Sequence, residues 1–334
     1  MDALLWLIAG LVALIAGAEL VVRYGSLLAA RMGVPPMIIG LTIVSIGTSA
    51  PELAVGIDAM ERNAGSLAVG NIAGTNIVNI MLILGLSAAF RAIPFGRRTR
   101  VLDLPGMAIA AVLVLVFALD GQLQFWEGVP LLAGAVIYTV LLGLWTRRKN
   151  GSRAAVDVPG VGVLGDAEVV ELPEPTARPN RWSAWWYLMV LIAGIVVIVV
   201  GADWLVSGAT SLARAVGVSD AFIGLTVVAI GTSAPELVTT IVSTLRGDRD
   251  IAIGNLIGSS VYNLTLILGL PVIVSNGSGP IDPHLLRIDL PIMVAISLLC
   301  VPLFLTGKRL SRWEGALLVL GYVAYLSYVI VVRS

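Results

Sequence analysis

The chain contains 334 residues, of which 58% are hydrophobic and 13% are charged, and its mean hydropathy is +0.97. This composition excludes an ordinary soluble domain and predicts an all-α integral membrane protein. Basic and acidic residues number 21 each, so the charge balance indicates no nucleic-acid partner. The single cysteine, Cys300, excludes an intramolecular disulfide and a zinc site built from cysteine pairs.

Ten apolar segments have about the 20 residues that a helix needs to cross a bilayer. The first has no basic leader and contains Glu19, which indicates a retained span rather than a cleaved signal peptide. The sequence therefore predicts a multi-pass protein of the cell membrane, plasma or inner, surrounded by lipid. The predicted spans lie near residues 3–22, 36–60, 64–89, 104–119, 127–145, 184–206, 220–245, 250–274, 288–306 and 313–332.

Basic residues are distributed unequally between the two sides of this ten-span chain. One set of loops, those after the odd-numbered spans, contains 17 of the 21. The other side has only Arg62, Arg214, Arg287 and Arg333. Because positive charge is enriched in cytoplasmic loops, both termini are predicted to lie outside.

The longest hydrophilic stretch, residues 146–183, is rich in proline and acidic residues. On the predicted topology it is a cytoplasmic linker, too short to form a domain of its own. It would join a first five-helix repeat, residues 1–145, to a second repeat, residues 184–334.

A shift of 184 residues aligns residues 17–86 with residues 201–270 without a gap, and the repeated motifs fall within 40–86 and 224–270. Between GLTIVSIGTSAPEL at 40–53 and GLTVVAIGTSAPEL at 224–237, 12 of 14 positions are identical. An odd number of spans per repeat inverts the second copy in the membrane. Inverted repeats of this kind predict a binding site near the bilayer midplane, where broken helices of the two halves meet.

Glu52 and Glu236 occupy matching places inside the second and seventh spans, each directly after a proline. A carboxylate at that depth is costly and needs a partner, a proton or a bound cation. No basic residue lies within a predicted span core, so a structural ion pair is disfavoured. Each proline also frees the carbonyl four residues earlier, Gly47 or Gly231, inside the membrane.

The residues next to these acids in the sequence offer oxygen ligands. Gly47, Thr48 and Ser49 offer carbonyls and hydroxyls within about one helical turn of Glu52, and oxygen-only ligands suit calcium or sodium. In the third and eighth spans, polar residues recur at every fourth position and could face the glutamates or form interhelical hydrogen bonds. They are Asn71, Thr75, Asn79, Asn255, Ser259 and Asn263; the glycines at 70, 74, 254 and 258 in these spans are expected to permit close helix packing.

These motifs resemble the cation/calcium exchanger superfamily, in particular its prokaryotic sodium/calcium antiporters, which are built from two inverted alpha-repeats. The family pattern is GTSxPE followed by GNxxGSNxxN or GNxxGSNxxD. Here the blocks are GTSAPE at 47–52 and 231–236, GNIAGTNIVN at 70–79 and GNLIGSSVYN at 254–263. The resemblance covers nearly the whole chain. It implies exchange of calcium for sodium by alternating access, in which the first and sixth spans slide as a gate over the other helices.

The resemblance also implies a ligand set. Calcium would lie between Glu52 and Glu236, with the carbonyls of Thr48 and Thr232. The sodium sites would add Ser49, Ser233, Thr75 and Ser259, the carbonyls of Ser45 and Ala229, and the central Asn79 and Asn263. The ions Ca2+ and Na+ are then cargo, and no cofactor is expected.

Two departures from the family pattern concern the coupling ion. Asn79 and Asn263 stand where many members pair asparagine with aspartate, and Ser260 replaces the asparagine of the second GSN. The centre then holds two carboxylates, which neutralise one calcium, two sodium ions or two protons. Calcium/proton exchange, or coupling to potassium or another cation, at the same site is therefore the alternative.

Two other classes of protein compete with an antiporter. A channel would also line its pore with carboxylates and hydroxyls, although inverted repeats with broken helices favour a transporter. An enzyme is disfavoured, because the chain has no HExxH or GxSxG motif and no histidine within a predicted span. The motifs do not determine the oligomeric state, and a monomer is the simplest expectation.

Overall fold

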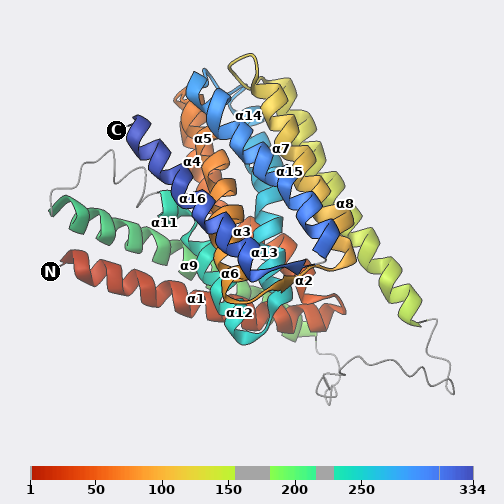
Figure 1. Ribbon diagram of the computed structural model, residues 1–334. Coiled ribbons are helices and arrows are strands. Elements are labelled where there is room, and N and C mark those ends of the chain that lie inside the picture. The colour runs from red at the N-terminus through yellow and green to blue at the C-terminus, as the bar shows by residue number, and fades with distance from the viewer. Residues whose placement is uncertain (1, 155–180, 216–228, 308, 334) are drawn as a thin grey trace.

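The computed structural model describes residues 2–154, 181–215, 229–307 and 309–333 (Figure 1). Within them the chain is all-helical, apart from two paired two-residue strands, β1 (Ile93–Pro94) and β2 (Arg309–Leu310). The first half contains α1 (Asp2–Met32), α2 (Pro36–Ile39), α3 (Ser45–Thr48), α4 (Ala50–Glu61), α5 (Gly65–Ile77), α6 (Gly85–Phe90), α7 (Leu104–Ala118) and α8 (Phe125–Ala154). The second contains α9 (Arg181–Ala215), α11 (Ala229–Thr232), α12 (Ala234–Arg246), α13 (Arg249–Tyr262), α14 (Leu268–Val274), α15 (Leu290–Gly307) and α16 (Arg312–Arg333).

Short π-helical segments join several of these helices end to end. Such segments widen the helix by one residue per turn and occur frequently at functional sites. In the described residues they are η1 (Gly40–Val44), η2 (Val78–Leu84), η3 (Thr99–Asp103), η5 (Asn263–Ile267) and η6 (Leu285–Asp289).

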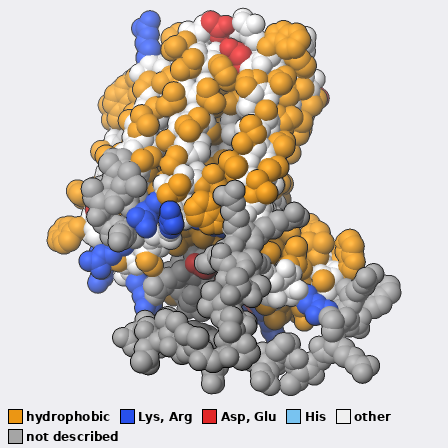
Figure 2. Space-filling view, turned by 90° about the vertical axis from the view of Figure 1, so that its right-hand side faces the viewer, with side chains coloured by type: hydrophobic (Ala, Val, Ile, Leu, Met, Phe, Trp, Pro, Cys, Tyr) orange, Lys and Arg blue, Asp and Glu red, His pale blue; other side chains and the backbone are white. Residues whose placement is uncertain are grey.

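The described part of the chain has seven helices that are long and apolar enough to cross a membrane, or eight if the bent pair Pro36–Thr48 and Ala50–Glu61 is one span. Figure 2 shows a broad band of hydrophobic side chains, with most of the visible lysine and arginine gathered below it. The prediction of a multi-pass membrane protein is confirmed. The predicted count of ten spans stays a prediction, since the span near 220–245 begins outside the described residues.

Several helices extend beyond the predicted spans. α1 reaches Met32 rather than residue 22, and α9 reaches Ala215 rather than residue 206. Hydropathy locates the most apolar stretch, whereas a helix continues wherever its residues still pack: Leu28 and Ala29, in the extension of α1, are buried. At the predicted linker, α8 continues to Ala154 and α9 begins at Arg181, and residues 155–180 lie outside the described part.

The two longest helices, α1 and α9, lie side by side across the others (Figure 1). With 31 and 35 residues, they are about 46 and 52 Å long, more than the ~30 Å of a hydrocarbon core. Glycines bring their backbones together: a methyl group added at Gly201 would lie 2.9 Å from the Cβ of Ala13 and 3.0 Å from the carbonyl oxygen of Gly10. Leu14 and Ile198 of the pair belong to an apolar core that also includes Val44 and Ala234 of the motif segments.

The remaining helices pack around a second, larger core. Ile72 of α5, Leu104 of α7 and Leu268 of α14 are buried in it. Tyr262, at the end of α13, is fully buried, and its hydroxyl lies 2.7 Å from Thr139 Oγ1 of α8. The α1–α9 pair therefore contacts the motif-carrying segments through the smaller core, whereas most of the other helices pack around the larger one.

The connecting loops gather on two opposite sides. On one, which we call the 280 side, loops 62–64, 119–124 and 275–282 meet: the Ser278 amide donates to the Leu123 carbonyl at 2.8 Å, and the Asp282 amide donates to Ser66 Oγ at 2.7 Å. On the other, the 310 side, loop 91–98 meets loop 308–311 through the antiparallel pairing of β1 with β2. The two sides define the two ends of any path through the bundle.

We expect Gly201→Leu to destabilise the protein, because the larger side chain has no room between α9 and α1. Overpacking of this kind costs about 1–3 kcal/mol, which should lower the midpoint of thermal unfolding in detergent. Gly143→Leu on α8 is the matched control, since nothing lies within 4 Å of a methyl group added there. Equal melting midpoints for the two variants would contradict the close contact of α1 with α9.

Candidate cation site

Each repeat contains a helix break directly before its buried glutamate. Ser49, between α3 and α4, has φ −87° and ψ 12°, and Ser233, between α11 and α12, has φ −88° and ψ 4°. The helices on either side of Ser49 are bent by 42°. Pro51 and Pro235 lie in the first two positions of the new helices, where a missing N–H costs no hydrogen bond. The same backbone feature therefore recurs 184 residues apart.

Glu52 and Glu236 lie in the first turns of α4 and α12. Both side chains are 0% exposed. The sequence predicts each acid within a kinked span, whereas in the structure each acid begins a new helix. This position matters electrically, because the N-terminus of a helix carries a partial positive charge that stabilises a nearby carboxylate.

A hydrogen bond joins the two repeats at this point. Ser49 Oγ donates to Glu236 Oε1 at 3.2 Å, and Ser259 Oγ lies 3.5 Å from the same oxygen. Ser49 precedes Glu52 by one helical turn, so the two carboxylates are brought to one place from opposite halves of the chain. The hydrogen bond shows that the first motif contacts the glutamate of the second.

Several oxygens at this centre have no hydrogen-bond partner within the described residues: both carboxylate oxygens of Glu52, Oε2 of Glu236 and Oγ of Ser233. A buried carboxylate oxygen without a partner is costly, and removing that cost requires a cation or a proton. The described residues contain no group of three or more acidic, histidine or cysteine side chains suited to a metal ion. The donor set is therefore two carboxylates with neutral oxygens, which fits calcium or sodium.

The central asparagines occupy equivalent π-helical segments. Asn79 is the second residue of η2 and Asn263 is the first residue of η5. Both side chains are buried, and neither the amide nitrogen nor the amide oxygen has a hydrogen-bond partner in the described part of the chain. Sequence periodicity places these residues on a polar face; it does not reveal that the helix widens where they lie.

Ser45 and Thr48 hold the second span against the eighth. Ser45 Oγ donates to the Gly40 carbonyl at 2.6 Å and lies 3.0 Å from the Asn255 carbonyl. Thr48 Oγ1 donates to Asn255 Oδ1 at 3.3 Å, and the Ser45 carbonyl accepts from Ser259 Oγ at 3.5 Å. Asn255 thus forms interhelical hydrogen bonds, one of the two roles that its place in the polar stripe predicts.

A cavity of about 530 Å³ opens on the 280 side and reaches two further predicted site residues, Thr75 of α5 and Thr232 of α11. Its outer lining includes Ser66 and Asp282. Ala229, whose carbonyl is also a predicted ligand, is the first residue of α11. The cavity therefore extends from residues of the 280 side to Thr75 and Thr232.

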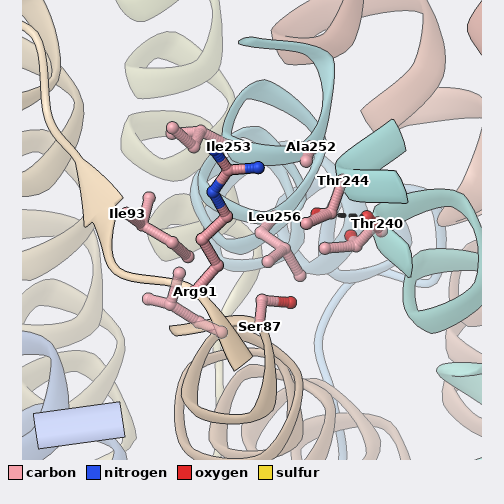
Figure 3. Close-up of a pocket in the computed structure, with 9 residues that line it drawn as sticks. Ser87, Arg91, Ile93, Thr240, Thr244, Ala252, Ile253 and Leu256 are labelled. Carbon is pink, nitrogen blue, oxygen red and sulfur yellow. Dashed lines mark hydrogen bonds between the residues drawn. The ribbon is translucent and has the colours of Figure 1, made fainter. Parts of the chain in front are cut away.

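Access from the 310 side is much narrower. Figure 3 shows the cavity there, where the long Arg91 side chain extends toward Ile253 and Thr244 donates a hydrogen bond to the Thr240 carbonyl. Its volume is about 10 Å³, close to the lower limit for a single water molecule. Of the two cavities, only the one on the 280 side is wide enough for a hydrated ion.

The glycine pairs of the two repeats differ in surroundings, although their sequences match. A methyl group added at Gly254 would lie 2.7 Å from the Met37 carbonyl oxygen, so close packing is confirmed there. At Gly74 nothing lies within 4 Å, and Gly70 meets only a leucine side chain at 3.4 Å. For these two the packing expectation is wrong, because they line the 530 Å³ cavity instead.

Comparison with known proteins identifies the family. The family described as sodium/calcium exchanger protein matches residues 3–144 and 186–331. The chain belongs to the sodium/calcium exchanger family. It is 36% identical to the inner membrane protein YrbG of Escherichia coli, over 96% of this chain and 94% of that protein. It is 32% identical to the sodium/calcium exchanger MaX1 of Methanosarcina acetivorans, over 96% of each chain.

The fold agrees with this assignment. The structure of the sodium/calcium exchanger from Methanococcus jannaschii matches with a TM-score of 0.78 and 26% identity, over 98% of each chain. Members of the sodium/calcium exchanger family are transporters rather than enzymes, and Ca2+ and Na+ are their substrates. The resemblance drawn from the four sequence blocks is confirmed, as are the membrane location and the cation/calcium antiporter class.

We expect Ser49→Ala to weaken calcium binding, because Glu236 loses a hydrogen bond that crosses between the repeats. A hydrogen bond to a charged group contributes about 1.5–3 kcal/mol, so a loss of affinity of about tenfold or more is expected by calorimetry in detergent. Ser297→Ala is the matched control: Ser297 is also buried but donates to the Met293 carbonyl within α15. Equal affinities for the two variants would exclude the proposed position of Ser49.

Proposed function

We propose that this member of the sodium/calcium exchanger family exchanges calcium for sodium, with calcium held between Glu52 and Glu236. The observation that carries the proposal is the Ser49–Glu236 hydrogen bond, which brings two buried acids together from opposite repeats. Two carboxylates balance the charge of one calcium ion. The carbonyls of Thr48 and Thr232, at the ends of the short helices α3 and α11, would supply neutral ligands.

Sodium would use oxygens around the same centre. Two sodium ions carry the same charge as one calcium, so either cargo neutralises the two glutamates, and the two would compete for them. The proposed sodium ligands are the hydroxyls of Ser49, Ser233, Thr75 and Ser259, the carbonyls of Ser45 and Ala229, and the amide oxygens of Asn79 and Asn263.

The unequal cavities support alternating access. We assign the 280 side to the outside, because the basic residues of the predicted loops are concentrated on the opposite side. On this assignment, the described conformation would be the one open to the outside. Transport would require the complementary state, in which the opening lies on the 310 side. The close backbone approach of α1 and α9 at Gly10 and Gly201 would let this pair move as a unit against the other helices.

The proposed topology has ten helices in two inverted five-helix repeats, with both termini outside. The recurrence of helix breaks at Ser49 and Ser233, and of π-helical segments at Asn79 and Asn263, supports this repeat. One chain supplies both glutamates, so a monomer suffices for the site. Calcium/proton exchange through the same two acids is the alternative function.

The decisive experiment is calcium-45 uptake into proteoliposomes that contain the purified protein. We expect a sodium gradient to drive uptake and Glu52→Gln or Glu236→Gln to abolish it, because each change removes half of the negative charge at the centre. Glu127→Gln is the matched control, since Glu127 also lies in the first turn of a helix but caps the Gln124 amide at the 280 side.

Other outcomes distinguish the alternatives. Uptake driven by a pH gradient without sodium would replace sodium with protons as the coupling ion. Calcium flux at full rate with neither ion on the opposite side would indicate a channel. Near-normal transport by either glutamine variant would overturn the assignment of the site.

A second prediction concerns stoichiometry. We expect Asn263→Asp to strengthen binding of an additional monovalent cation, because a third carboxylate at the centre supplies a further negative charge. Calcium uptake by this variant should depend more steeply on sodium concentration. Asn276→Asp, in the loop after α14, adds the same charge far from the centre and should leave that dependence unchanged. An identical sodium dependence in both variants would count against a central role for Asn263.

A further inference from the structure

The wide cavity on the 280 side contains a buried acid that the proposed exchange site does not use. Asp289 lines this cavity together with Asn71 and Thr75. Its side chain is 2% exposed, and Tyr325 of α16 donates a hydrogen bond to its Oδ1 at 2.7 Å. Intramembrane acids are costly and mark ion pathways more often than structural sites. Asp289 thus places a carboxyl group in the wall of the same cavity as two residues of the polar stripe on α5.

The first repeat contains the counterpart of this acid in a different environment. The sequence DLP recurs at 103–105 and 289–291, and Asp103 and Asp289 each end a π-helical segment. Asp103 likewise accepts a hydrogen bond from a tyrosine, Tyr138, at 3.2 Å. However, Asp103 lies 3.5 Å from the guanidinium of Arg98 and does not line the wide cavity. The position equivalent to Arg98 is His284, which does line it.

The cavity connects Asp289 with the candidate site. Asn71 and Thr75 are one turn apart on α5 and share a face, so oxygen-bearing side chains continue from the region of Asp289 toward the centre. Thr232 lines the same space. A volume of about 530 Å³ has room for a cation with its hydration shell, since a water molecule occupies roughly 30 Å³ in the liquid.

We infer that Asp289 is a recruiting site for hydrated cations on the path from the 280 side to the exchange centre. The inference rests on the proposed function. The carboxylate attracts calcium or sodium into a water-filled space with low-dielectric walls, and the ion then moves past Asn71 to Thr75. A charged cleft of this kind raises the local concentration of its ligand and the association rate by about 10–10³-fold.

The first test compares Asp289→Asn with Asp103→Asn in proteoliposomes of known protein orientation. For Asp289→Asn we expect the KM for calcium on the 280 side to rise about tenfold, with kcat at saturation and KM on the 310 side retained. Asp289→Glu should restore the low KM because it restores the charge. Asp103→Asn should leave the KM on the 280 side unchanged. The KM of the unmodified protein should also rise with added choline chloride more steeply than that of Asp289→Asn, because salt screens the attraction.

A second measurement leaves Asp289 in place, in case its substitution prevents folding. Leu67 lines the cavity and is 56% exposed, and the natural cysteine, Cys300, is buried. With Leu67→Cys in an Asp282→Asn background, a positively charged methanethiosulfonate should react faster than a negatively charged one. Millimolar calcium should reduce that preference.

The results separate this inference from the proposed function. Equal reaction rates for the two reagents, or an unchanged KM on the 280 side in a folded Asp289→Asn protein, would overturn the recruiting site alone. Failure of the unmodified protein to exchange calcium under any ion gradient would instead overturn the proposed function.

Discussion

The burial of two carboxylates inside a membrane protein is the constraint on which the rest of this structure depends. Glu52 and Glu236 are completely shielded from solvent, and an unpaired charge in such a place is strongly unfavourable. The helix breaks at Ser49 and Ser233 reduce that cost, since they turn two helix N-termini toward the acids. Serine hydroxyls from both halves add hydrogen bonds to Glu236. The negative charge of the two carboxylates remains unbalanced within the described residues. In the proposed mechanism, a cation balances this charge while it is bound.

The surroundings of the centre are unequal on its two sides. Gly254 packs against the backbone near Met37, whereas Gly70 and Gly74 line a wide cavity. Matching sequences thus lie in different environments. Under the proposed alternating-access mechanism, the two repeats would exchange these environments during transport. A cation must reach the centre from one side without an open path to the other, and a structure with one wide and one narrow cavity meets this requirement.

Asp103 and Asp289, at the ends of η3 and η6, also have matching sequences and different surroundings. Both are held by a tyrosine hydroxyl, but one lies beside a fixed arginine and the other beside water-accessible space. The guanidinium of Arg98 lies 3.5 Å from Asp103 and offsets part of its charge. Asp289, on the cavity wall, can interact with mobile ions. Asp103 and Asp289 are therefore a second pair of acids in matching sequences whose surroundings differ, as those of the glycines do.

The sequence by itself determined the membrane class, the repeat and the identities of the central acids, because hydropathy, the 184-residue shift and the position of Glu52 after Pro51 are local properties of the chain. It could also indicate calcium or sodium, since the motifs offer only oxygen ligands. Only the tertiary structure decided that Ser49 contacts Glu236, that Asn79 and Asn263 lie in widened helices, and that Gly74 faces a cavity while Gly254 faces a backbone. The physical reason is that these features depend on which surfaces meet. Two copies of one motif have the same local preferences, and the packing of the helices around them decides which copy opens to water.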